Sequence, residues 1–127
     1  MNTDISELVA WQKVLEAAGR DALDEGAKIV AKGSLNIKDE ARRLAPTGPH
    51  IPAYASSIRY DVRTGADWVE GEVGPTGGGQ ARLGAVLEYG SPTSPPHPHH
   101  EPAGDHEEPR FYSAAEELAA KLVERYG

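Results

Sequence analysis

The stretch ISELVAWQKVLEAAGRDALDEGAKIVAKGSLNIKDEARRL, residues 5–44, contains the strongest periodic pattern in the chain. Apolar or small residues recur there every three or four positions, which is the spacing of one face of an amphipathic helix. The pattern therefore predicts one long helix or two stacked helices. The stripe consists of Leu8, Trp11, Leu15, Ala18, Ala22, Gly26, Ile29, Gly33, Ile37, Ala41 and Leu44.

Capping and helix-breaking residues along this stretch set the expected ends of the helix. Asp4 followed by Glu7 is a plausible capping pair, and Pro46 should end the helix because the residue before a proline avoids helical angles. Gly19, Gly26 and Gly33 are spaced seven apart, and each costs about 1 kcal/mol relative to alanine inside a helix. We expect a break near Gly19. The alternative is a groove in which another backbone packs closely.

Two short alternating segments follow a proline-rich loop at residues 46–57. Apolar and charged residues alternate over 58–63 and again over 68–74, which predicts a β-hairpin with one apolar and one charged face. An isolated hairpin is marginally stable in water, so its apolar face should pack on the long helix.

The remainder of the chain predicts two further helices. Residues 81–89 favour a short helix with Gly90 as its C-cap, although a strand fits as well. A terminal amphipathic helix should begin at Pro109 and run to about Tyr126. The expected fold is α+β: a long N-terminal helix, continuous or broken, packed on an antiparallel hairpin or small sheet, then a short helix and a C-terminal helix. We expect one domain over 1–127, with extended loops at 46–57 and 91–108.

Composition excludes several classes of protein. The 127 residues include 13 basic and 20 acidic side chains, a formal charge of −7, which opposes tight binding to phosphates. The chain has no cysteine, and no apolar run approaches the ~20 residues of a membrane span. The first residues lack the basic start and apolar stretch of a signal peptide. We therefore expect synthesis in a cytoplasm, with no membrane partner.

The strongest chemical signal is a group of histidines at His97, His99, His100 and His106, mixed with carboxylates. Imidazole and carboxylate bind zinc or nickel, but a helical His-Glu-x-x-His motif is absent and prolines stiffen the segment. The run at 77–79 lacks the lysine and the serine or threonine of a phosphate-binding loop. Ser56 and Ser57 have no recognisable histidine partner. We predict no catalytic residue, no metal site and no cofactor.

The order of several short motifs resembles a known family. Leu-Ala-Pro-Thr-Gly at 44–48 closes the long helix, Val-Gly-Pro at 73–75 ends the hairpin, and Leu-Glu-Tyr-Gly-Ser at 87–91 precedes Pro-His-Pro-His-His-Glu-Pro-Ala at 96–103. This arrangement resembles the gene-product-ten-like family of siphophage head–tail joining proteins, also called tail-completion proteins or tail components. The match spans nearly the whole chain.

Details of the sequence refine this resemblance. The segment 32–38 and the block Pro-Arg-Phe at 109–111 resemble the branch of the family found in phages of actinobacteria. Ser91 stands where the family usually has threonine, and His99 where an aromatic residue commonly anchors the proline motif. The histidine leaves open whether this segment docks on its own subunit or on a neighbour.

The resemblance implies a structural virion protein of the phage neck, made in the host cytoplasm. Copies of the chain would form a ring, six-fold by the family pattern, that joins head to tail and contacts neighbouring neck and tail proteins. DNA would pass through the channel without sequence-specific binding. Contacts in such a ring are head to tail, and we expect the two proline-rich loops to form them. The predicted interface consists of Pro49, His50, Ile51, Pro52, Tyr54, Tyr89, Pro96, His97, Pro98 and His99.

Three other functions compete with this hypothesis. A tail terminator or minor capsid protein has the same small α+β plan. A metal-dependent enzyme would use the histidine group, and stoichiometric metal in untagged protein would support it. A nucleic-acid-binding regulator would need a salt-dependent affinity for DNA that the acidic charge opposes.

Overall fold

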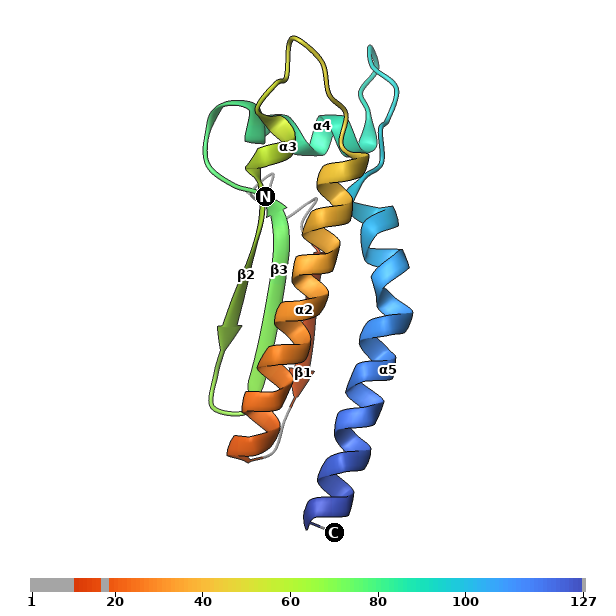
Figure 1. The fold of residues 1–127 in the computed structure, drawn as a ribbon. Coiled ribbons are helices and arrows are strands. Elements are labelled where there is room, and N and C mark those ends of the chain that lie inside the picture. The colour runs from red at the N-terminus through yellow and green to blue at the C-terminus, as the bar shows by residue number, and fades with distance from the viewer. Residues whose placement is uncertain (1–10, 17–18, 127) are drawn as a thin grey trace.

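The computed structural model describes residues 11–16 and 19–126, which form a mixed helix and strand fold (Figure 1). Three strands make one antiparallel sheet in the order β1-β3-β2. Helix α2 packs on this sheet, and α5 lies alongside α2. The elements are β1 (Trp11–Glu16), α2 (Arg20–Leu44), α3 (Tyr54–Ser57), β2 (Ile58–Thr64), β3 (Trp68–Pro75), the 3₁₀ helix η1 (Gly79–Leu83), α4 (Gly84–Tyr89) and α5 (His100–Tyr126).

Helix α2 confirms most of the later part of the predicted stripe, but Val30 is buried where the stripe had Ile29, and Leu44 is only half-buried. Its buried residues are Ala22, Gly26, Val30, Gly33, Ser34, Ile37 and Ala41, so the packed face follows the three-to-four spacing of the sequence. The helix starts directly after Gly19, whose φ of 88° favours glycine, and the expected break there is confirmed. It ends at Leu44, because Ala45 adopts an extended conformation (φ −61°, ψ 143°) before Pro46.

The prediction of helix over residues 11–16 was wrong, because this segment forms strand β1. Its register on β3 runs from Trp11 opposite Val73 to Glu16 opposite Trp68. Two residues spaced by four share a face in both a helix and a strand, so the spacing of Trp11 and Leu15 could not separate the two. The tertiary structure decided, since β1 pairs with the N–H and C=O groups on the second edge of β3. The predicted capping pair at Asp4 and Glu7 and the stripe positions Leu8 and Ala18 lie outside the described residues.

The hairpin of β2 and β3 is confirmed. Val69, Gly71 and Val73 are buried on the face of β3 that meets α2. On the opposite face, Arg63 of β2 forms ion pairs with Glu70 and Glu72 of β3. The predicted short helix is also confirmed, since η1 and α4 cover residues 79–89 and Gly90 caps α4 with a φ of 80°. The loop predicted at 46–57 is shorter than expected, because its last four residues form α3.

The start of the last helix was predicted nine residues too late. Helix α5 begins at His100, so part of the predicted loop 91–108 is helical. Pro102 is the third helical residue, where no intrahelical N–H bond is needed, and it is therefore tolerated. Pro109 lies inside the helix and removes one internal bond, which costs about 3 kcal/mol in an isolated helix. Burial of Ala103, Gly104 and Phe111 offsets this cost.

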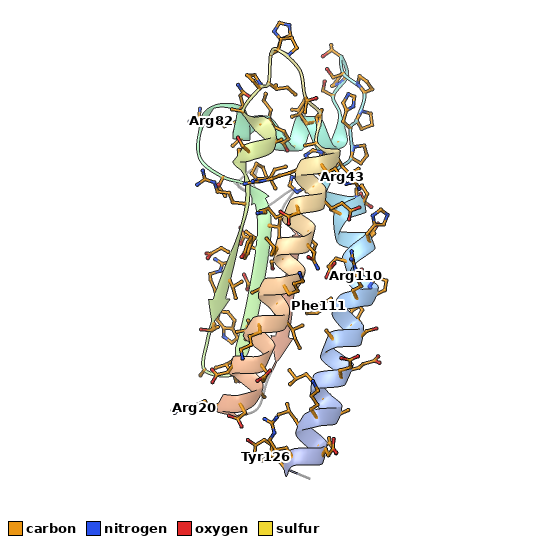
Figure 2. The ribbon with its side chains drawn as sticks, viewed as in Figure 1. Arg20, Arg43, Arg82, Arg110, Phe111 and Tyr126 are labelled. Carbon is orange, nitrogen blue, oxygen red and sulfur yellow. The ribbon has the colours of Figure 1, made fainter. Side chains whose placement is uncertain are left out.

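Two groups of buried apolar residues hold the layers together. Phe111 extends from α5 toward α2 (Figure 2), and a Cβ added to Gly33 would lie 3.4 Å from its Cδ1. The space beside Gly33 thus accommodates an aromatic side chain, not the second backbone considered from the sequence. One core group is Val30, Val69 and Phe111; the other is Ile37, Ala41, Ala45, Tyr54, Ile58, Val73 and Ala103.

Candidate functional site

The two proline-containing loops predicted to meet other subunits lie at the same end of the molecule. Figure 1 shows the segment after α2 and the segment between α4 and α5 at the top, together with α3 and α4. The two segments are distant in sequence: Tyr54, which follows the first, and His99, which ends the second, are 45 residues apart. Their convergence creates one surface from two distant parts of the chain.

Most of the predicted interface residues are exposed on this surface. Tyr89 is 57% exposed, and Ile51 is half-buried against the core. The other exposed members are Pro49, His50, Pro52, Pro96, His97 and Pro98. Tyr54 and His99 are both 0% exposed, so these two predicted interface residues have no surface to offer a partner in this fold. The interface itself stays a prediction.

His99 packs within its own chain, which answers the question left open by the sequence. Its Nε2 lies 2.6 Å from the Tyr54 hydroxyl, and its Nδ1 lies 2.7 Å from the His97 carbonyl. Because the carbonyl can only accept, Nδ1 carries the proton and the Tyr54 hydroxyl donates to Nε2. The two rings meet edge to face, with centroids 5.4 Å apart. The pKa of Tyr54 is raised by burial and by the charge of Glu88.

Glu88 is the centre of the junction between α4 and α5. Its carboxylate is buried and accepts three backbone N–H groups at the start of α5: His99 (3.0 Å) and His100 (2.9 Å) on Oε1, and Glu101 (3.1 Å) on Oε2. These groups have no partner inside the helix, and a carboxylate at a helix N-terminus also complements the helix dipole. Glu88 is thus a long-range cap that fixes where α5 begins.

Sequence reasoning missed the role of Glu88 because the cap comes from another helix. The only signal was the resemblance itself, in which a glutamate precedes the aromatic residue and the glycine at 89–90. A glutamate on a short amphipathic helix is normally solvated, and no local pattern distinguishes this one.

His100 is the least satisfied polar group of the junction. The side chain is 3% exposed, and neither Nδ1 nor Nε2 has a hydrogen-bond partner. Its ring centroid lies 4.5 Å from that of His99. Burial, with a smaller contribution from His99, lowers the pKa of His100 to about 4, so the ring is neutral near pH 7.

The four-histidine group considered from the sequence does not assemble. His106 lies on α5 with Nδ1 2.6 Å from Glu40 of α2, and His97 is exposed. Only His99 and His100 of the four come together, and Glu88 joins them. The atoms that these three residues offer as ligands all lie within 4.8 Å of one another.

Comparisons with family models, curated proteins and solved structures found no match to this chain. None of the helices among the described residues combines the length and apolar character needed to cross a membrane.

Proposed function

We propose that this chain is a structural subunit of a tailed-phage neck, which assembles with copies of itself into a ring joining head to tail. The ring is six-fold by the family pattern and surrounds the DNA channel. The observation that carries the proposal is the motif order along nearly the whole chain, from the proline after α2 to the Pro-Ala pair at the start of α5.

The arrangement of the loops supports a role in contacts between subunits. Residues 46–53 and 91–98 form irregular, mostly exposed chain at one end, and prolines restrict their backbone. Stiff loops lose less conformational freedom on binding than flexible ones, which favours association. The junction of Glu88, His99 and Tyr54 anchors the second loop from below, so the exposed residues are held in a defined position.

The charge of the chain supports passage of DNA without binding. The net charge of −7 repels phosphates, so a ring built from such subunits would not retain the genome. DNA would then pass the ring without sequence-specific contacts.

The proposal is tested by the mass of the untagged protein in solution and by its position in intact virions. We expect rings, or a monomer that joins purified necks. The variant H50E/H97E places charge on the exposed loops and should abolish assembly. The matched control is K121E, because Lys121 is exposed near the other end of α5, and this variant should assemble normally.

Three results would count against the proposal. They are a stable monomer that never joins a virion, assembly unaffected by H50E/H97E, and catalytic turnover by the isolated chain. Density elsewhere along the virion axis would instead support a tail terminator or a minor capsid protein.

A further inference from the structure

We propose that the buried junction of α4 and α5 binds a divalent transition-metal ion of the Zn²⁺ type, with Glu88, His99 and His100 as the protein ligands. The three side chains are all buried, and their ligand atoms lie within 4.8 Å of one another. Two histidines and one glutamate form a donor set found in zinc proteins. The inference does not depend on the proposed function.

The unpartnered imidazole of His100 is the first argument for a ligand. A buried polar group without a hydrogen bond is costly, and His100 leaves two ring nitrogens in this state. A metal ion would satisfy one of them directly. The low pKa of His100 keeps the ring neutral, which is the protonation state that binds metal.

His99 can join as a ligand through a change of tautomer. Its Nδ1 lies 3.1 Å from Glu88 Oε1, which places the ring beside the carboxylate that would share the ion. If Nδ1 binds the ion, it gives up its bond to the His97 carbonyl and the proton moves to Nε2, which then donates to the Tyr54 oxygen 2.6 Å away. Metal-binding histidines usually donate their other N–H to such a partner.

Glu88 supplies the negative charge that the ion needs. A carboxylate has about four acceptor positions, and three are used by the N–H groups of residues 99–101. The position left for an ion is on Oε2, because Oε1 accepts two of the three bonds. The carboxylate also offsets the partial positive charge at the N-terminus of α5, which would otherwise disfavour a cation.

Binding of the ion would restrain the second exposed loop, residues 91–98. Glu88 precedes the irregular segment 91–98, and His99 and His100 follow it, so one ion would close the loop at its base. A ligand that binds only the folded chain stabilises it, so the melting temperature should rise with Zn²⁺ concentration.

The test uses untagged full-length protein that has been stripped with a chelator and titrated with Zn²⁺ by calorimetry. We expect one ion per chain and a higher melting temperature. H100L fills the same buried site with an apolar side chain and should fold, but its affinity should fall about 100-fold or more. H97A removes an exposed histidine and is the matched control, which should bind like the wild type. Y54F removes only the partner of His99 and should weaken binding about 10-fold.

Comparison of Zn²⁺ binding by the wild type, H100L and H97A decides whether the site exists. Saturable binding that is lost in H100L and retained in H97A supports the site. Absence of saturable binding by the folded wild type overturns the proposal, as does unchanged affinity in H100L. Loss of binding in H97A alone would assign the ion to the exposed loop and would also overturn it.

Discussion

The Tyr54 hydroxyl donates a 2.6 Å hydrogen bond to Nε2 of His99, and the two residues are 45 positions apart in sequence. Tyr54 opens α3 directly after the first exposed loop, and His99 ends the second loop directly before α5. Both side chains are fully buried, so the bond joins the bases of the two loops inside the molecule. The position of one loop therefore depends on that of the other.

Replacing Tyr54 with phenylalanine should destabilise the fold by about 1–3 kcal/mol, because a buried His99 nitrogen would lose its partner. Urea denaturation measures this difference. Y60F is the control, since Tyr60 is 38% exposed and its ring would still lie near the Lys38 ammonium. Equal stability of Y54F and Y60F would show that the buried bond contributes nothing.

Replacing Glu88 should affect α5 more than any exposed acidic substitution. E88A leaves three backbone N–H groups at the start of α5 without their acceptor, two of them buried, and should cost roughly 3 kcal/mol or more. E88Q keeps one acceptor oxygen and should lose less. Hydrogen exchange of the first turn of α5 should speed up in E88A. E116Q, in an exposed part of α5, should leave both stability and exchange unchanged.

A methyl group at Gly71 should be strongly unfavourable because α2 crosses β3 very closely there. A Cβ at this position would lie 2.2 Å from Ser34 Oγ and 2.7 Å from Val30 Cγ1. We expect G71A to lose about 1–3 kcal/mol through overpacking, measured as a lower denaturation midpoint. G78A is the matched control, since the nearest atom to its Cβ would be Arg82 Nη2 at 3.8 Å. A stable G71A would mean that α2 and β3 are further apart.

Stability should fall in mild acid because of His100. Its pKa is lowered to about 4 in the folded chain from the ordinary 6.5, so between these values the unfolded chain binds a proton that the folded chain does not. Stability is therefore lost as pH falls from 6.5 toward 4, by up to about 1.4 kcal/mol per pH unit for one group. Unfolding of chelator-treated wild type and H100L near pH 7 and near pH 5 measures this contribution. A parallel decline in both proteins would contradict it.

The local sequence pattern was sufficient to predict the elements that bury one face along their whole length. The stripe from Ala22 to Ala41 specified the packed face of α2, and the alternation over 58–63 and 68–74 specified the hairpin. Pro46 and Gly90 marked two helix ends, because proline and glycine restrict or relax the backbone wherever they occur. These features depend on neighbouring residues, so the sequence by itself determined them.

Only the tertiary structure decided the elements whose partners are distant in sequence. Residues 11–16 became a strand because β3 offered them an open edge, and α5 began at His100 because Glu88 of another helix capped it. The burial of His99 likewise involves Tyr54 of α3, 45 residues earlier in the sequence. Periodicity records which side of an element is apolar, but hydrogen bonds between distant residues leave no trace in it. The junction of Glu88, His99 and His100 is therefore a property of the fold.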